Sequence, residues 1–304
     1  MTVLLNLGGT IALAYQDGQP KEVGFQEFIT SDVTVVDVAP TSSNGLGWRH
    51  LRILRERLLA KWRAGETRFV VTVGTDALEE VLYFLSLVIP SGASAAVVGA
   101  IRPRSAPDSD GPLALSQAFQ WLDHGESGEI VACCESQVIK GPRVTKAFLG
   151  HWTFQPCSPA DDGLIPWVLS DRCKLLRRSP QVPMLTVGVE AGVWLAKILR
   201  GGRFEGVVIQ AFGPGDVPPQ LVKPIRHLLS RQIPVVLVSR ANPGRVEPLF
   251  PGIPGTSHEL LSSGVLSAGA LDGVRARIRL LVALAARPRV SVASVFVMRG
   301  ESAS

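Results

Sequence analysis

The sequence lacks an apolar run of the length that a membrane helix needs, roughly 18 to 20 consecutive apolar residues. We therefore expect no membrane partner. The first residues, MTVLLNLGGTIALA, are apolar but have no basic start and end at a Gly-Gly turn. They predict a buried first strand and not a secretory signal.

Cysteine is scarce, and no two cysteines have the CxxC spacing of a metal or redox motif. The four are Cys133, Cys134, Cys157 and Cys173. Because adjacent residues of a strand point to opposite faces, Cys133 and Cys134 are not expected to act together. This pattern is typical of reduced, packed thiols and predicts a cytoplasmic location.

Motifs for metals and nucleotides are also missing. The five histidines stand singly, without the paired spacing of metal ligands: His50, His124, His151, His227 and His258. The glycine-rich segments match neither GxGxxG nor GxxxxGK[ST], which argues against a dinucleotide or phosphate loop. We therefore expect no metal and no cofactor.

The chain carries a net charge of +5, which raises the question of a nucleic-acid partner. Its basic residues are spread through helix-like segments such as RHLRILRERLLAKWR, where arginines alternate with an apolar face. There is no array of aromatic and basic residues for base stacking. The charge is better explained by solvated helix faces, and no nucleic-acid partner is expected.

Short apolar runs alternate with helical patterns through the first half of this 304-residue chain. The candidate strands are Val3–Leu7, Val33–Val38, Phe69–Val73, Ala95–Val98 and Ile130–Cys134. The candidate helices are Trp48–Trp62, Asp76–Val88 and Pro112–Leu122. The alternation predicts an α/β fold, an open and mostly parallel sheet with helices on both faces.

A polar, basic and proline-bounded segment at 171–183 predicts a linker between two domains, 1–170 and 184–304. Beyond it the alternation resumes as a smaller α/β domain. Its expected strands are Leu185–Val189, Gly206–Ala211 and Pro234–Ser239. Three helices are expected: one that ends at Arg200, one at Pro219–Ser230 and one within Gly269–Ala286.

Two candidate site clusters follow predicted strands. Gly8-Gly9-Thr10 follows the first strand, and Gly74-Thr75-Asp76 follows the third. Ligands of open α/β sheets bind beyond the carboxyl ends of the strands, so both turns are suitably placed. Each cluster also has a simpler explanation. Thr10 could merely belong to a tight turn, and Asp76 could be a helix N-cap that forms a capping box with Glu79 three residues later.

Two further segments complete the candidate site. Gly99-Ala100 ends another strand, and its backbone N–H groups could face the same cleft, while Asp110-Gly111-Pro112 resembles a helix cap. Lys146 lies in RVTKAF. A lone lysine is normally a solvated charge, but a buried lysine can act as a base.

Taken together, LNLGGTI, TVGTDALEE, VVGAIRPRSAPDSDGP and RVTKAF resemble the bacterial asparaginase–glutaminase family in order and spacing. The corresponding family segments read TGGTI, THGTDTLEE, VGAMRP with a following ADGP, and VTK. The resemblance covers roughly residues 3 to 160 and continues more faintly to the end, and it is closest to the cytoplasmic type.

The resemblance implies an amidohydrolase that acts on a side-chain carboxamide. Thr10 would be the nucleophile that forms an acyl-enzyme and releases ammonia. Thr75, Asp76 and Lys146 would form a charged triad. The backbone N–H groups of Thr75 and Ala100 would stabilise the oxyanion.

The substrate would be held by residues near the same strand ends. Asp76 would bind its α-amino group, and Gly74 lies beside it. The α-carboxylate would bind at Thr41-Ser42, in APTSSNG. Family active sites lie at the interface of an intimate dimer, so the resemblance implies a homodimer or homotetramer.

Several residues depart from the family pattern. Val73 replaces a histidine or glutamine, Ala77 a threonine and Phe148 a histidine, and Tyr15 is too close to Thr10 to match the family's lid tyrosine. Two hypotheses remain open. In the first, the chain hydrolyses L-asparagine or a larger asparagine- or glutamine-like amide. In the second, it is a catalytically weak or inactive protein of this fold with a binding or regulatory role.

Overall fold

The computed structural model describes residues 1–25, 32–124, 127–157 and 162–299. The chain divides into two compact units. Unit 1 comprises Met1–Cys157 and Val168–Arg172, and unit 2 comprises Ser158–Trp167 and Cys173–Ser304. The division differs from a single linker at 171–183, because Lys174–Leu175 within that segment pairs with Arg287–Ala286 of unit 2.

Unit 1 is built on a six-stranded sheet in the order β4-β1-β5-β6-β7-β8. All neighbours pair in parallel except β7 and β8. Its strands are β1 Thr2–Gly8, β4 Val33–Thr41, β5 Arg68–Thr72, β6 Ser94–Gly99, β7 Ile130–Cys134 and β8 Gln137–Lys140. Two hairpins stand apart from it: β2 Leu13–Gln16 with β3 Gln19–Glu22, and β9 Val144–Phe148 with β10 Trp152–Pro156.

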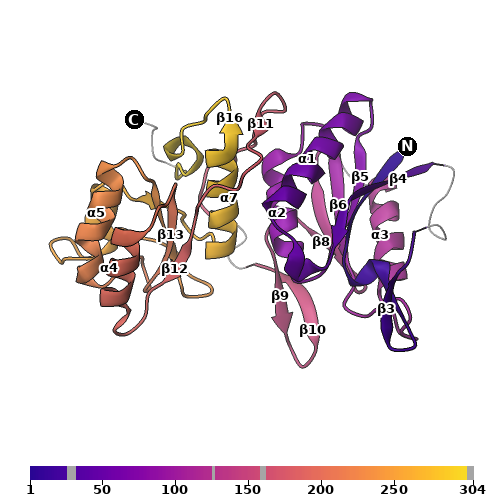
Figure 1. The fold of residues 1–304 in the computed structure, drawn as a ribbon, viewed down its shortest axis with the longest axis horizontal. Coiled ribbons are helices and arrows are strands. Elements are labelled where there is room, and N and C mark those ends of the chain that lie inside the picture. The colour runs from indigo at the N-terminus through magenta and orange to yellow at the C-terminus, as the bar shows by residue number, and fades with distance from the viewer. Residues whose placement is uncertain (26–31, 125–126, 158–161, 300–304) are drawn as a thin grey trace. The chain divides into compact units, whose positions relative to one another are not determined.

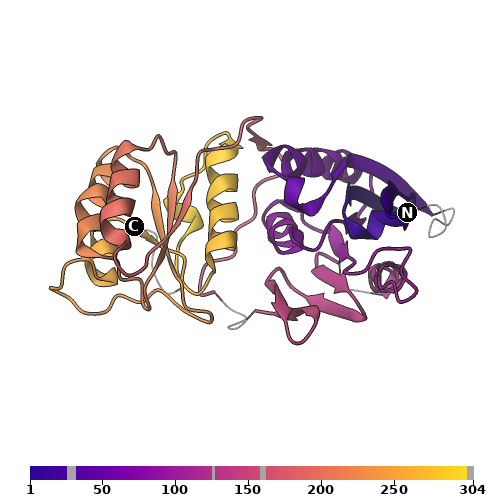
Figure 2. The ribbon, with the colours of Figure 1, turned by 60° about the horizontal axis from the view of Figure 1, so that its bottom comes forward.

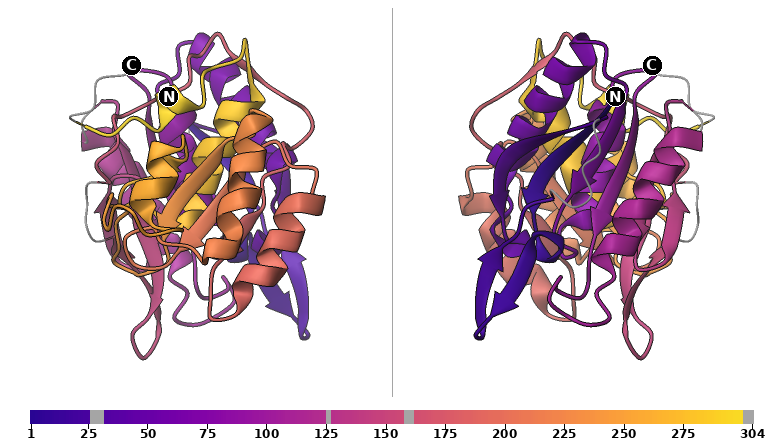
Figure 3. Two further views of the ribbon diagram at one scale, coloured as in Figure 1. Left: turned by 90° about the vertical axis from the view of Figure 1, so that its left-hand side faces the viewer. Right: turned by 90° about the vertical axis from the view of Figure 1, so that its right-hand side faces the viewer.

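Helices cover both faces of this sheet (Figure 1; Figure 3, right). They are α1 Trp48–Arg63, α2 Leu78–Val88 and α3 Gly111–His124, with short 3-10 turns η1 Thr10–Ala12 and η3 Ser43–Gly45. Leu4, Val70 and Val98 pack against Leu115 of α3, while α1 and α2 meet through an edge-to-face contact of Trp48 and Phe84. The central strands β5, β6 and β7 are largely apolar, as is typical of parallel strands that are buried on both faces.

Unit 2 has a four-stranded parallel sheet in the order β12-β13-β14-β15. Its strands are β12 Met184–Thr186, β13 Val207–Ala211, β14 Val235–Ser239 and β15 Leu266–Ser267, with β11 Lys174–Leu175 pairing β16 Ala286–Arg287. Its helices are α4 Ala191–Gly201, α5 Val222–Ser230, α6 Ser257–Ser262 and α7 Gly273–Ala285, with η4 Pro219–Leu221 and η5 Ala293–Val295. Figure 2 shows α4 and α5 on one face of the sheet and α7 on the other.

The predicted fold class is confirmed: a larger, mostly parallel sheet with helices on both faces, and a smaller α/β unit after it. What positions the candidate site is the parallel arrangement of β4, β1, β5 and β6. Their carboxyl ends, at Thr41, Gly8, Thr72 and Gly99, lie along one edge of the sheet.

Candidate active site

The turn that carries Thr10 is held against the turn that carries Thr75. Gly9 has a φ of +87°, and a Cβ at that position would lie 2.2 Å from the backbone nitrogen of Gly74. Only glycine allows this approach without displacement of the backbone. The close contact brings the two threonine-bearing turns together, and Thr10, half-buried, opens η1.

Asn6 fastens the Thr10 turn to the neighbouring strands. Its Oδ1 accepts hydrogen bonds from the backbone N–H of Gly8 at 2.8 Å and from Thr72 Oγ1 at 3.1 Å. Its Nδ2 donates to Asp37 Oδ1 at 2.9 Å. Asn6 was not predicted, although a polar side chain inside an otherwise apolar strand is a signal that could have identified it.

The capping-box interpretation of Asp76 and Glu79 is wrong. Helix α2 begins at Leu78 with Ala77 as its N-cap, two residues later than predicted. The carboxylate of Asp76 instead accepts hydrogen bonds from Lys146 Nζ at 2.6 Å and from Ser43 Oγ at 3.0 Å. Glu79 is also used elsewhere: it accepts from the backbone N–H of Lys146 and from Thr145 Oγ1.

Lys146 lies on β9 and meets both residues of the second turn. Its Nζ donates to Thr75 Oγ1 at 2.9 Å and to Asp76 Oδ1 at 2.6 Å, so the contact predicted from the sequence is present. The Lys146 side chain is only 19% exposed, and its ammonium lies 5.2 Å from the centre of the Trp152 ring. Partial burial keeps the solvent from screening this ion pair fully.

The hydrogen bond from Lys146 lowers the pKa of the Asp76 carboxyl below its ordinary value of 3.8. The hydrogen bond from Ser43 acts in the same direction, burial opposes both, and the charge of Lys146 adds a further, smaller lowering of the pKa. Asp76 is therefore a carboxylate at neutral pH. It offers a fixed negative charge to a ligand that carries an amino group.

Asp110 organises the loop after β6. Its buried carboxylate accepts from the backbone N–H groups of Ile101 at 2.9 Å and Arg102 at 2.8 Å, in addition to standing before α3 as predicted. Within the described ranges, no protein acceptor is found for the backbone N–H of Ala100 or of Thr75. Both residues are buried at the same sheet edge.

The segment after β4 contributes a residue other than those predicted. Thr41 accepts a hydrogen bond from the backbone N–H of Gly9 through its carbonyl oxygen, and the exposed Ser42 donates to Asn44. The side chain that reaches Asp76 is Ser43, one residue further on. A Cβ on Gly74 would lie 2.5 Å from that of Ser43, so the two segments are in close contact.

The departures from the family pattern differ in exposure. Val73 and Ala77 are buried, whereas Phe148 is 62% exposed and packs edge-on against Trp152, with ring centres 5.3 Å apart. Tyr15 is exposed on the β2–β3 hairpin, which is held to the loop after β6 by a hydrogen bond from the Tyr15 backbone to Ser105. The apolar change that can face a ligand is therefore the one at Phe148.

No group of three or more His, Cys, Asp or Glu side chains in 1–25, 32–124, 127–157 and 162–299 could hold a metal ion. Among the same residues, no helix is long and apolar enough to span a bilayer.

Family models match both units. The model described as "Asparaginase, N-terminal" matches residues 2–155, and that of the "Glutaminase/Asparaginase C-terminal domain" matches residues 182–292. A probable L-asparaginase of Deinococcus radiodurans is 30% identical over 251 residues, 75% of this chain and 74% of that protein. An L-asparaginase of Bacillus licheniformis is 27% identical over 312 residues, 93% of this chain and 94% of that protein.

Solved structures share the fold. A probable cytoplasmic L-asparaginase from Campylobacter jejuni superimposes with a TM-score of 0.78 at 21% identity, covering 98% of this chain and 99% of that one. The thermostable L-asparaginase from Thermococcus kodakarensis gives 0.75 at 21% identity, covering 97% and 99%.

The fold and these matches define an amidohydrolase of the α/β class. The chain belongs to the asparaginase family, through both its N-terminal and its C-terminal domain.

Proposed function

We propose that the chain hydrolyses a side-chain carboxamide, L-asparagine or a larger asparagine- or glutamine-like amide, with Thr10 as the nucleophile. The threonine oxygen would bond to the amide carbon, the C–N bond would break with release of ammonia, and water would hydrolyse the resulting ester to a carboxylate. A hydroxyl is a weak nucleophile at neutral pH and needs a proton acceptor and a stabilised oxyanion.

The observation that carries the proposal is the contact between Gly9 and Gly74, which brings the turn of Thr10 to the turn of Thr75. Thr75 in turn accepts a hydrogen bond from Lys146. Since the ammonium donates to Thr75 Oγ1, the hydroxyl proton of Thr75 remains available for donation. We infer that Thr75 donates this proton to the departing amide nitrogen and recovers the proton that Thr10 loses on attack, so that the nitrogen leaves as ammonia.

The oxyanion would be stabilised by the backbone N–H groups of Thr75 and Ala100. Both are buried at the carboxyl edge of the sheet, and no protein acceptor for them is found in the described part of the chain. Preorganised donors of this kind are each worth roughly a hundredfold to a thousandfold in rate. Asp110, which fixes Ile101 and Arg102, would hold the Ala100 donor in place.

Substrate binding is assigned to the segments around Asp76. Its carboxylate, held ionised by Lys146 and Ser43, would accept the α-amino group. Thr41, Ser42 and Gly74 remain the proposed neighbours of the α-carboxylate, and Ser43 joins them because it already contacts Asp76.

The location and assembly of the protein also remain proposals. Burial raises the pKa of the Cys133 thiol to about 12, and the four cysteines are free, as expected of unreactive thiols in the cytoplasm. We infer a homodimer or homotetramer from the family and from the exposed apolar side chains on α4.

Ammonia release from a panel of amides tests the proposal. Wild-type protein should release ammonia from at least one asparagine-like amide, and Thr10→Val should reduce kcat roughly a thousandfold or more with an unchanged unfolding midpoint. Thr10→Ser, which retains a hydroxyl, should retain part of the activity. If no amide releases ammonia while one still binds, the alternative of a binding or regulatory protein holds instead.

A further inference from the structure

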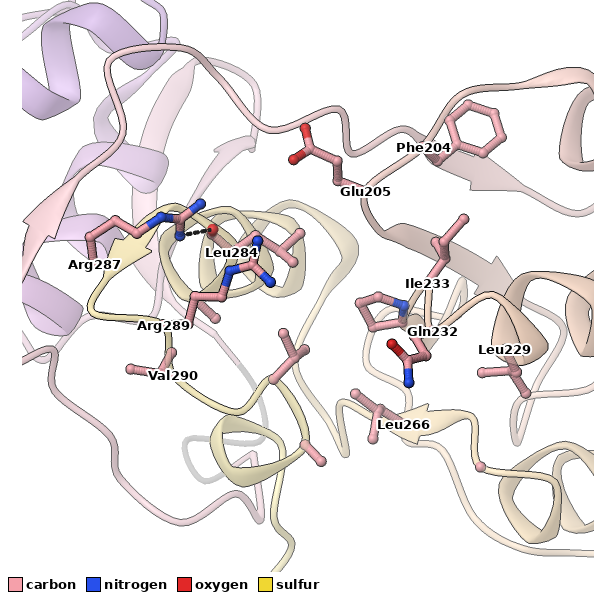
Figure 4. Close-up of a pocket in the computed structure, with 15 residues that line it drawn as sticks. Phe204, Glu205, Leu229, Gln232, Ile233, Leu266, Leu284, Arg287, Arg289 and Val290 are labelled. Atoms are coloured by element: carbon pink, nitrogen blue, oxygen red, sulfur yellow. Dashed lines mark hydrogen bonds between the residues drawn. The ribbon is translucent and has the colours of Figure 1, made fainter.

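Unit 2 contains a pocket of about 590 Å³ that the proposed function does not use. It lies at the amino-terminal edge of the unit's parallel sheet, beside the C-terminal end of α7 (Figure 4). Phe204 precedes β13, Ile233 precedes β14 and Leu266 begins β15. Ligands of parallel sheets usually bind at the opposite, carboxyl edge. None of the residues that line this pocket belongs to the candidate active site of unit 1.

The pocket has an apolar wall and a cationic side. Leu229, Ile233 and Leu266 contribute the wall, and Arg287 and Arg289 extend toward the middle of the pocket from the other side in Figure 4. Its volume falls in the range of small-molecule pockets, roughly 300 to 1,000 Å³, which are typically apolar with a few polar groups.

Arg287 is fixed in place by its own backbone neighbours. Its Nη1 donates to the carbonyl oxygens of Leu284 at 3.1 Å and Ala286 at 2.6 Å. These neutral acceptors hold the guanidinium without neutralising its charge. The remaining donors of its planar fork are of the type that binds a carboxylate with two parallel hydrogen bonds.

Arg289 is exposed, and among residues 1–25, 32–124, 127–157 and 162–299 it has neither an ion pair nor a hydrogen bond. The one carboxylate lining the pocket is Glu205, which pairs with both terminal nitrogens of Arg178 at 2.6 and 2.9 Å. It also accepts from the backbone N–H of Gln181 at 3.0 Å. The charge of Arg287 also acts on Glu205, but one carboxylate faces three guanidinium groups, those of Arg178, Arg287 and Arg289, so the pocket keeps a net positive charge.

We propose that this pocket binds the anion of a straight-chain aliphatic carboxylic acid. The carboxylate would lie against the guanidinium groups of Arg287 and Arg289, and the chain against Leu229, Ile233 and Leu266. The inference is independent of catalysis in unit 1, since each residue it uses belongs to unit 2.

Calorimetric titration of the full chain with hexanoate, octanoate and decanoate tests the site directly. We expect one bound anion per chain and an affinity that rises roughly fourfold per buried methylene until the pocket is filled. Decanol, which lacks the charge, should bind at least about tenfold more weakly than decanoate, and decylamine, of opposite charge, should not bind.

Substitutions within unit 2 identify the pocket as the place of binding. Arg289→Gln should weaken decanoate binding roughly tenfold, whereas Arg231→Gln, which removes an exposed arginine outside the pocket, should leave it unchanged. Val290→Glu places a carboxylate in the pocket and should abolish binding, while Val290→Gln, of equal size, should not.

Three results would overturn the proposal: no binding of any of the acids, equal binding of decanoate and decylamine, or equal effects of Val290→Glu and Val290→Gln. Thermal unfolding of each variant shows whether the fold is kept. Thr10→Val should bind decanoate as the wild type does, which separates failure of this proposal from failure of the proposed function.

Discussion

The ammonium of Lys146 lies 2.9 Å from the hydroxyl oxygen of Thr75, although the two residues are 71 positions apart. Thr75 follows β5, whereas Lys146 lies on a hairpin outside the main sheet. Glu79 holds them together: it belongs to α2, which begins just after Thr75, and it accepts a hydrogen bond from the backbone N–H of Lys146. One carboxylate thus sets the position of the strand that delivers the ammonium.

Lys146→Met tests the role of that ammonium. We expect kcat to fall roughly a hundredfold to ten thousandfold, because proton transfer through Thr75 loses its charged partner. The free energy of unfolding should change by only about 1 kcal/mol, since the Asp76 carboxylate is 64% exposed and can be hydrated. Ammonia release and urea unfolding measure the two effects.

Lys140→Met is the matched control for that experiment. Lys140 also forms an ion pair, with Glu129 at 3.3 Å, but its side chain is 66% exposed and lies on β8 away from the proposed site. Its loss should leave kcat unchanged. Equal activity of the Lys146 and Lys140 variants would remove Lys146 from the mechanism.

Glu79 is predicted to be a positioning residue. Glu79→Ala removes the acceptor for the Lys146 backbone and for Thr145 Oγ1, so the ammonium should shift from Thr75. We expect kcat to fall roughly a hundredfold with little change in KM, as is typical of small misplacements. Glu79→Gln retains one oxygen acceptor and should recover most of the rate; an equal loss in both variants would argue against positioning.

The sequence predicts the sheet well because apolar runs such as Val3–Leu7 and Ile130–Cys134 are buried on both faces. It predicts the site less well where contacts are tertiary. Asp76 and Glu79 have the spacing of a capping box, yet both carboxylates bind groups of β9, which no local pattern encodes. Ser43 was missed for the same reason, since its partner Asp76 is 33 positions away.

The second hairpin was also not predicted. The strand Val144–Phe148 is half-exposed and interrupted by Lys146, so it lacks the continuous apolar run that identified the central strands. Its partner strand, Trp152–Pro156, ends with two exposed residues, Gln155 and Pro156. Within this hairpin, only the motif RVTKAF was identified from the sequence, through its resemblance to the family.

The lowered pKa of Asp76 predicts a pH dependence with a definite sign. Because the folded pKa lies below the ordinary value of 3.8, the ionised carboxylate stabilises the native state above that value. The stabilisation is lost as the pH falls through the folded pKa. Wild type should therefore exceed Asp76→Asn in unfolding free energy at about pH 7, by at most about 1 kcal/mol.

The difference between wild type and Asp76→Asn should vanish once the pH has fallen below the lowered pKa of Asp76, where both side chains are neutral. Urea unfolding across this range measures it. In a Lys146→Met background the loss should begin at higher pH, since the main cause of the lowered pKa is gone. A difference that grows on acidification would contradict the assignment.

Helix α4 is predicted to lie in a subunit interface. Val193, Trp194 and Ile198 on its outer side are 53%, 68% and 45% exposed, and Val189 before it is 91% exposed. Apolar patches of this kind mark interaction surfaces.

Sedimentation should show at least twice the chain mass of 32.5 kDa, and Trp194→Glu should shift the sedimenting mass toward that of the monomer. His227→Glu, on the exposed side of α5, should not; a purely monomeric wild type would refute the prediction.

The exposed pair Phe148 and Trp152 predicts that L-asparagine is not the best substrate. The two rings pack edge-on, and Trp152 lies beside the ammonium of Lys146, so an apolar surface borders the proposed site. An apolar extension of the amide that lies on this surface should gain roughly fourfold per buried methylene in kcat/KM. The measurement is ammonia release from asparagine and from N-acylated or side-chain-extended amides.

Phe148→His restores a polar side chain at this position without removing the Trp152 ring beside Lys146. It should lower the preference for the extended amides roughly tenfold while leaving asparagine turnover within about twofold, because the lost contact is apolar. Leu113→Ala removes another exposed apolar side chain, 50% exposed on α3, and should change neither value. A wild-type kcat/KM for asparagine of ~10⁴ M⁻¹s⁻¹ or more, with no gain for larger amides, would show that Phe148 does not select the substrate.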